Sequence, residues 1–296
     1  MYYDKNTIIF LDGNWVKATE AKTDLYNQTM HYGAGVFEGI RAYKTPSGFK
    51  IFKSIEHYER LIESAKAMHI NLEYSAKEMD EITHTLLEKN NMTNCYIRPL
   101  VYLGANMSLT PTSTVHFMIA SWVWGKFLGN DLLDVMVSSY QRPNPKSCPV
   151  HAKVVGHYTN SILATTEAKS KGFHEALLLD SDGYVAEAPG ANFFLEKDEV
   201  LYTPPLGNIL PGITRETIIE YAQELGVEVV EELFTIDKIL GADSAFFVGT
   251  AVEVAGIKSI EGVSFQKKWE DTIGHNLAAM YRQRVTSDEH ENLTIV

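Results

Sequence analysis

The apolar residues change their spacing repeatedly along this chain, and that change is the strongest constraint on its fold. Residues 54–69 place apolar side chains at helical spacing, whereas residues 95–103 and 115–123 are β-rich runs. Ser75 and Glu78 stand in the S-x-x-E spacing of a capping box, which predicts that a second helix begins there. Strands and helices in this order indicate an α+β domain in the first part of the chain.

Hairpins and helices are expected to alternate in the second half. Strand-like runs cover residues 176–179, 192–195 and 200–203, with turns at Asp182-Gly183 and near Lys197-Asp198. The other elements that we expect there are a helix over 214–225, a β-rich stretch over 244–260 and a last helix over 269–284.

The length of the chain, 296 residues, predicts two domains, because single domains usually have about 100–150 residues. Residues 122–130 (WVWGKFLGN) contain two glycines and no clear period, which is typical of a connection. We therefore expect a small N-terminal α+β domain over 1–121, a connection over 122–133 and a larger C-terminal domain over 134–296.

Charge and composition exclude several classes of protein. The formal net charge of −12 argues against a nucleic-acid binder or a membrane-surface protein, since both usually present clustered Lys and Arg. Cys95 and Cys148 are far apart and in no metal-ligand spacing, which favours a reducing compartment and gives no indication of a metal site. Without a signal peptide or an apolar run of about 20 residues, the default expectation is a cytoplasmic protein.

The common cofactor and hydrolase motifs are missing. Residues 31–39 (HYGAGVFEG) are rich in glycine but lack the G-x-G-x-x-G spacing, and the sequence has no G-x-x-x-x-G-K-[ST], G-x-S-x-G or H-E-x-x-H. These absences weigh against a nicotinamide enzyme, a nucleoside-triphosphate enzyme, an esterase and a zinc protease.

Seven segments, in order along the chain, resemble the class IV fold of pyridoxal-phosphate enzymes and, within it, the branched-chain amino-acid aminotransferases. These segments are Tyr32–Tyr43, Glu56–Leu61, Tyr96–Leu100, Ala152–Tyr158, Glu187–Asn192, Pro211–Arg215 and Gly249–Ala251. The resemblance implies a fold like that of D-amino-acid aminotransferase, with a β-barrel-like larger domain that binds pyridoxal phosphate. It also implies a homodimer or a larger homo-oligomer.

The cofactor needs an amine for a Schiff base, a charge partner for its pyridinium nitrogen and an anion site for its phosphate. The resemblance implies that Lys153 is the catalytic amine and that Glu187 faces the ring nitrogen. It implies too that Tyr158 donates to the phenolic oxygen. Taken alone, these residues could equally be a surface lysine, an exposed glutamate after a hairpin and a core tyrosine.

The phosphate site has support from the sequence pattern itself. Gly212, Ile213 and Thr214 stand at the start of the helix expected over 214–225, where free backbone N–H groups and the helix dipole favour an anion. The resemblance adds the hydroxyl of Thr250 and the charge of Arg60. An ordinary helix cap and a solvated helix arginine are the structural alternatives.

The resemblance implies that Tyr96 and Arg98 bind the substrate, and because alternate residues of a strand point to one face, both can line the same wall of a pocket. The resemblance implies that Arg98 binds the distal carboxylate of glutamate or 2-oxoglutarate, and that Tyr96 binds the α-carboxylate. The other substrate-binding residues that it implies are the backbone of Thr250 and Ala251, the apolar surface of Tyr32, Phe37 and Trp124, and Arg41, which would orient acidic groups. Core packing is the alternative for each aromatic residue.

The resulting hypothesis is transamination of leucine, isoleucine or valine with 2-oxoglutarate, giving a branched-chain 2-oxo acid and glutamate. A D-amino-acid aminotransferase, an R-selective amine transaminase, an aminodeoxychorismate lyase and a noncatalytic cofactor-binding protein of the same fold are the alternatives. The chain departs from the family pattern in two places. Phe127 stands where bacterial members commonly have a tyrosine, and the loop 104–114, which reaches the neighbouring subunit's site in related dimers, lacks its usual glycines. Both departures concern substrate preference.

Overall fold

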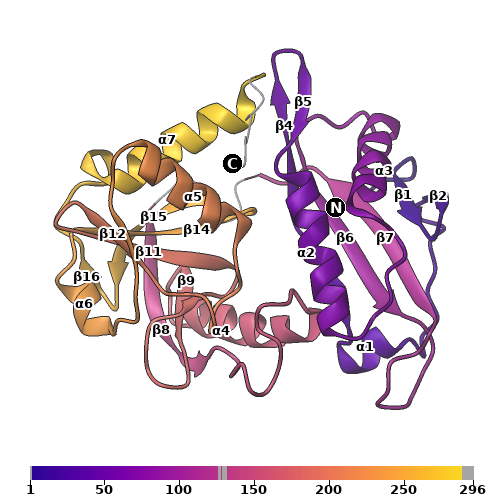
Figure 1. Ribbon diagram of the computed structural model, residues 1–296, viewed down its shortest axis with the longest axis horizontal. Coiled ribbons are helices and arrows are strands. Elements are labelled where there is room, and N and C mark those ends of the chain that lie inside the picture. Colours follow the sequence, from indigo (N-terminus) through magenta and orange to yellow (C-terminus); the bar gives the residue numbers. More distant parts are fainter. Residues whose placement is uncertain (1, 126–127, 129–131, 289–296) are drawn as a thin grey trace.

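The computed structural model describes residues 2–125, 128 and 132–288. Its strands form two separate sheets, one built from the first part of the chain and the other from the second part (Figure 1). The last strand of the first sheet ends at Trp122, and the first strand of the second sheet begins at Leu133. No helix of the described residues is both long enough and apolar enough to cross a membrane.

The first sheet has seven strands, and each pair of neighbouring strands in it is antiparallel. Its order is β2-β1-β7-β6-β4-β5, with β3 paired to β6. The strands are β1 (Ile8–Leu11), β2 (Asn14–Lys17), β3 (Gly35–Phe37), β4 (Ile40–Thr45), β5 (Gly48–Ile51), β6 (Cys95–Leu103) and β7 (Val115–Trp122). The helices of this part are α1 (Gln28–Tyr32), α2 (Ser54–Ala67) and α3 (Ala76–Lys89).

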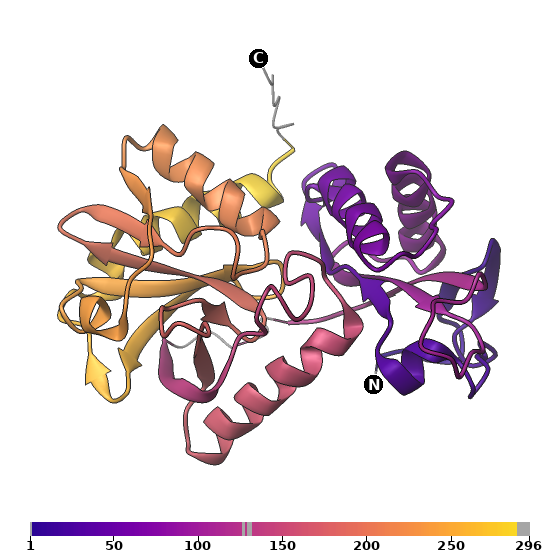
Figure 2. The same ribbon diagram turned by 60° about the horizontal axis from the view of Figure 1, so that its bottom comes forward.

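Helices α2 and α3 lie together over one face of the first sheet (Figure 2). Leu61 of α2 and Leu86 of α3 are completely buried in a core that includes Ile97 and Phe117 of the sheet. The predicted capping box opens α3, because the Ser75 hydroxyl accepts from the Glu78 amide and the Glu78 carboxylate accepts from the Ser75 amide. The two helices predicted in this region are therefore confirmed.

The second sheet has nine strands in the order β13-β12-β11-β14-β15-β8-β9, with β10 beside β11 and β16 beside β15. Its strands are β8 (Leu133–Gln141), β9 (Glu175–Leu179), β10 (Glu187–Ala188), β11 (Ala191–Lys197), β12 (Val200–Thr203), β13 (Val229–Glu231), β14 (Ser244–Gly249), β15 (Glu253–Ile260) and β16 (Val263–Ser264). Three neighbouring pairs are parallel, namely β12 with β13, β8 with β15, and β8 with β9.

Helices pack on both faces of the second sheet. Helices α5 (Ile213–Glu224) and α7 (Ile273–Thr286) cover one face, and α4 (Tyr158–Ser170) packs against β8 and β9 (Figure 2). The small helix α6 (Ile236–Leu240) lies near the edge of this half (Figure 1). Short 3₁₀ turns at Val155–His157 and Trp269–Asp271 precede α4 and α7.

Three features of the second half differ from the sequence-based expectation. The strand predicted over 176–179 pairs in parallel with β8, and not in a hairpin with the strand at 192–195. Neither β8 nor α4 is predicted. Helix α4 packs small side chains, Ala164 and Ala168, into the core, so its sequence lacks the stripe of large apolar residues that indicates a helix. The last helix begins at Ile273, after Thr272 accepts from the His275 amide, and not at Trp269.

A buried ion pair joins the two sheets. Arg41 of β4 donates to Glu253 at the start of β15 over 3.2 Å, and its other terminal nitrogen donates to the backbone oxygens of Trp124 and Gly125. Glu253 has a left-handed backbone, with φ of 58°, where the chain turns out of β14 into β15. Arg41 therefore connects the first sheet both to this turn and to the segment that follows β7.

Candidate active site

One pocket lies between the two sheets and brings together most of the residues that the sequence singles out. The predicted residues that line it are Phe37, Arg60, Tyr96, Arg98, Trp124, Lys153, Tyr158, Glu187, Ile213, Thr214, Thr250 and Ala251. They come from both halves of the chain, so the pocket forms only when the two sheets are packed together.

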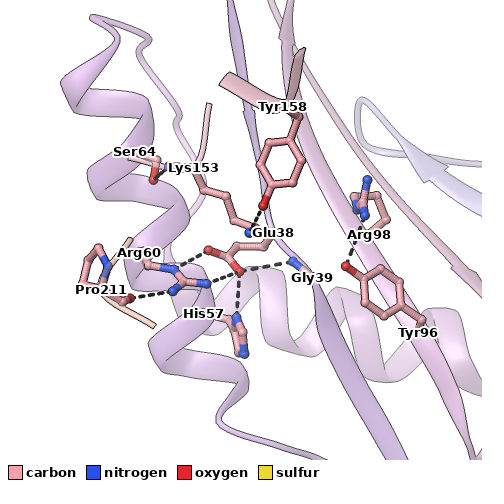
Figure 3. Close-up of polar contacts among 10 residues, drawn as sticks. All are labelled: Glu38, Gly39, His57, Arg60, Ser64, Tyr96, Arg98, Lys153, Tyr158 and Pro211. Atoms are coloured by element: carbon pink, nitrogen blue, oxygen red, sulfur yellow. Dashed lines mark hydrogen bonds and ion pairs between the residues drawn. The ribbon is translucent and has the colours of Figure 1, made fainter. Parts of the chain in front are cut away.

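Lys153 reaches the pocket from a backbone that is held by the first sheet and by α2. Its carbonyl accepts from the Phe37 amide at 3.1 Å, and its amide donates to the Ser64 hydroxyl at 3.0 Å. The Nζ atom lies 2.6 Å from the Tyr158 hydroxyl (Figure 3). It also lies 5.0 Å from the centre of the Phe37 ring. The side chain is half-buried, so the amine is positioned at the pocket wall but remains accessible from it.

Glu187 presents a buried carboxylate to the pocket. It accepts from Arg142 at 2.8 Å, from the Asn192 side chain at 2.9 Å and from the Leu210 amide at 3.1 Å. Burial raises the pKa of the Glu187 carboxyl, and the nearby Arg142 guanidinium counteracts part of that rise. Such a carboxyl is well suited to share a proton with a cationic ring nitrogen. No sequence pattern points to Arg142, which follows β8 and also lines the pocket.

The start of α5 forms the anion-binding end of the pocket. Its first residue is preceded by Gly212, and no side chain of the described residues caps it, so first-turn amides are available. A Cβ atom at Gly212 would lie 1.9 Å from Oδ1 of Asn192, which explains the glycine. Thr214 is buried and lines the pocket with Thr250. These donors and the dipole of a twelve-residue helix fit a phosphate group.

Arg60 adds a guanidinium to this end of the pocket. Its Nε and Nη2 atoms donate to the Glu38 carboxylate at 2.7 and 2.9 Å, and Nη1 donates to the Pro211 carbonyl at 2.7 Å (Figure 3). His57, one helical turn before Arg60, contacts Glu38 at 2.7 Å through Nδ1. Glu38 and His57 belong to matching sequence segments, but nothing in the sequence indicates that they meet.

Tyr96 and Arg98 share one face of β6, as their spacing predicts. Nη2 of Arg98 donates to the Tyr96 hydroxyl at 3.1 Å, and the guanidinium lies 4.5 Å from the centre of the Phe37 ring. The Nε atom of Arg98 is buried without a hydrogen-bond partner among the described residues, and the side chain lines the pocket, so its guanidinium can reach a carboxylate bound there. A Cβ atom at Gly39 would lie 2.0 Å from the Tyr96 hydroxyl, so the tyrosine sits directly against the chain there.

Two residues predicted to bind substrate lie outside this pocket. Tyr32 is exposed at the end of α1, and its hydroxyl donates to the Met107 carbonyl at 3.3 Å. Arg41 is buried against Glu253, so it does contact an acidic group, but it does not line the pocket. Tyr32 is the last residue of α1, and Arg41 stands opposite Tyr96 in the pairing of β4 with β6 but is held by Glu253 at the start of β15. Phe127 lies outside the described residues.

Comparison with known proteins identifies the family. The model of the family "Amino-transferase class IV" matches residues 35–260, which is most of the chain. The chain belongs to the class IV aminotransferases. This aminotransferase is 43% identical over 265 residues to the branched-chain-amino-acid aminotransferase of Pseudomonas aeruginosa, an alignment that covers 88% of this chain and 86% of the relative.

Solved structures agree with this assignment. The branched-chain amino acid aminotransferase of Escherichia coli superposes with a TM-score of 0.93 at 35% identity, covering 98% of each chain. That of Thermobaculum terrenum, solved in its PLP-form (holo-form), superposes with a TM-score of 0.90 at 30% identity, covering 95% of each chain. The resemblance of the seven sequence segments to the branched-chain group, and the fold class that it implies, are therefore confirmed.

Proposed function

We propose that this aminotransferase transfers the amino group of branched-chain L-amino acids to 2-oxoglutarate with pyridoxal phosphate as its cofactor. The observation that carries the proposal is the arrangement of one pocket: an amine at Lys153, a buried carboxylate at Glu187, a helix start at Gly212 and a guanidinium at Arg98. These groups match the aldehyde, ring nitrogen and phosphate of the cofactor and the carboxylate of an acidic substrate. The family of the chain and the names of its relatives support the same reaction.

Different pocket residues would bind different parts of the cofactor. The amides at the start of α5, with Thr214, Thr250 and Arg60, would hold the phosphate, and Glu187 would face the ring nitrogen. Tyr158 would donate to the phenolic oxygen next to Lys153. When bound, pyridoxal phosphate supplies an electron-accepting ring that makes the α-proton of an amino acid acidic. Because these contacts come from both sheets, the cofactor would also join the two halves, which we propose are domains over 1–121 and 134–296.

Lys153 would move the proton of the reaction. Its Nζ atom is a base of suitable reach, and the Tyr158 hydroxyl at 2.6 Å restricts where that atom lies. The rigid backbone contacts of Lys153 with Phe37 and Ser64 leave motion mainly to the end of the side chain. Such an arrangement delivers and returns a proton at the substrate α-carbon without moving the chain.

The substrate side of the pocket would accept two kinds of side chain. The rings of Phe37 and Trp124 would offer an apolar surface. Tyr96 packs directly against Trp124, and the Arg98 guanidinium lies over the rings of Phe37 and Tyr96. An apolar leucine side chain needs no polar partner, whereas a glutamate carboxylate does. Tyr96 and the backbone of Thr250 and Ala251 would bind the α-carboxylate that both substrates share.

A second copy of the chain is proposed to complete the site. Large apolar side chains are exposed around α1 and the loop that follows β6, namely Leu25, Tyr26, Met30, Tyr32 and Leu109. An exposed apolar surface of this kind is typical of a protein interface, so a homodimer would cover it. The mass in solution tests this, and a monomer at micromolar concentration would contradict it. The two free cysteines support a cytoplasmic location, where thiols stay reduced.

A substrate panel tests the proposed reaction. Leucine, isoleucine, valine, their D-enantiomers and a chiral amine are each mixed with the purified protein and 2-oxoglutarate, and glutamate is measured together with the visible spectrum. We expect glutamate from the three branched-chain L-amino acids. Transfer from D-amino acids or amines alone would place the enzyme in another group of the same fold, and a spectrum without transfer would favour a noncatalytic protein.

A further inference from the structure

We propose that Glu38 and His57 are positioning residues that hold the Arg60 guanidinium in place for the cofactor phosphate. This inference rests on the proposed function, because it concerns the phosphate end of the same pocket. Glu38 stands between β3 and β4, at the end of the pocket where α2 approaches the start of α5 (Figure 3).

The carboxylate of Glu38 binds two side chains of α2 and one backbone amide. Its carboxylate is completely buried and accepts four hydrogen-bond contacts, two from Arg60, one from His57 and one from the Gly39 amide at 3.2 Å. Arg60 and His57 are three residues apart on α2, so their side chains lie on the same helical face. Both oxygens of Glu38 are thus directed at groups that α2 supplies.

The charge of Arg60 and the burial of His57 determine how Glu38 interacts with these two side chains. Burial alone would raise the pKa of the Glu38 carboxyl, but Arg60 and His57 beside it hold that pKa well below its usual range. Burial lowers the pKa of the His57 imidazole, and its Nδ1 atom donates to the Glu38 carboxylate, which can only accept. Glu38 therefore pairs with the permanent positive charge of Arg60, and His57 adds a second donor from α2 that restricts the orientation of the carboxylate.

The geometry leaves Arg60 with a defined capacity to bind an anion. A guanidinium has five N–H groups. Nε and one N–H of Nη2 are directed at Glu38, and one N–H of Nη1 is directed at Pro211, immediately before the start of α5. One N–H remains on each terminal nitrogen, in a residue that lines the pocket. Glu38 on one edge and Pro211 on the other would thus fix where these two donors point.

A comparison of two cofactor forms tests the inference. The full-length protein is stripped of cofactor, and the dissociation constants of pyridoxal phosphate and of pyridoxal, which lacks the phosphate, are measured by absorbance for the parent and for Glu38→Gln. If Glu38 acts through Arg60 on the phosphate, pyridoxal phosphate should bind at least about 10-fold more weakly, the scale of one charge-assisted hydrogen bond. Pyridoxal should bind as it does to the parent.

Two further variants separate this role from a general effect on the fold. In an Arg60→Met background, Glu38→Gln should no longer weaken the binding of pyridoxal phosphate, because the guanidinium through which Glu38 acts is gone. Glu175→Gln removes another buried carboxyl, in β9 and outside the pocket, and should change neither constant. His57→Asn, which keeps a donor near the Nδ1 position, should preserve most of the preference for the phosphorylated form, and His57→Leu should reduce it.

Several results would overturn the inference. Equal weakening of both ligands by Glu38→Gln would indicate a structural role, and so would an effect that persists at full size without Arg60. If Glu38→Gln does not fold, the pair His57→Asn and His57→Leu decides the question by the same ratio of constants. The parent protein distinguishes this from a failure of the proposed function, since a parent that binds neither ligand would refute the cofactor assignment itself.

Discussion

Replacing Arg98 by methionine tests how one pocket serves an apolar and an acidic substrate. Methionine keeps much of the length of the side chain and can still pack on the Phe37 ring, which lies 4.5 Å from the guanidinium. The change removes the charge, the buried Nε donor and the hydrogen bond to Tyr96. We expect the reaction with glutamate or 2-oxoglutarate to suffer and the reaction with leucine to be largely spared.

The expected size of the effect is that of one hydrogen bond between the charged Arg98 and the distal carboxylate. A hydrogen bond to a charged group contributes about 1.5–3 kcal/mol, so losing the contact to the distal carboxylate should lower kcat/KM for 2-oxoglutarate by roughly 10- to 150-fold. Losing the contact with Tyr96 would act on the α-carboxylate that we propose Tyr96 binds, which both substrates share. That loss should therefore appear equally in both half-reactions and cancel in their ratio.

Single-turnover spectra measure the two half-reactions separately, one started with leucine and the other with 2-oxoglutarate. The ratio of the two rate losses is the result that matters. Arg98→Lys serves as the control, since it keeps the charge but not the forked geometry, and should lose less with 2-oxoglutarate. Equal losses in both half-reactions would refute a selective role for Arg98, and no loss in either would remove it from the substrate site.

Three other substitutions test the remaining roles. Lys153→Ala should give a protein without covalently held cofactor and with almost no turnover, as reduction and peptide mapping would show; a cofactor bonded to another lysine would contradict this. Glu187→Gln keeps the shape of the side chain but removes its charge, so kcat should fall much more than cofactor affinity, and an unchanged kcat would mean that Glu187 does not contact the ring nitrogen. Arg41→Met leaves the buried Glu253 carboxylate with only the partly exposed Arg282, so urea unfolding should show a loss of roughly 3 kcal/mol, and a loss below about 1 kcal/mol would show that the pair contributes little.

Several parts of this protein are determined by short stretches of sequence. The start of α3 depends on Ser75 and Glu78, three residues apart, and the bounds of β6 agree with the predicted run over 95–103. Helix caps and apolar periodicity depend on residues a few positions apart, so they can be recognised without knowing how the rest of the chain folds. The family, and with it the reaction class, could also be inferred from the order of the matching segments, because catalysis restricts residue types at those positions.

Tertiary structure alone decides which side chains meet. Arg142 and Glu187 form an ion pair across 45 positions of sequence, and Arg41 meets Glu253 across 212. Neither pair has a local pattern, since each depends on how β8, β10 and the two sheets pack. The same packing places Tyr32 outside the pocket and brings Glu38 into contact with Arg60. Charged groups this deeply buried are tolerated only with a partner, and that partner is supplied by the fold and not by neighbours in the sequence.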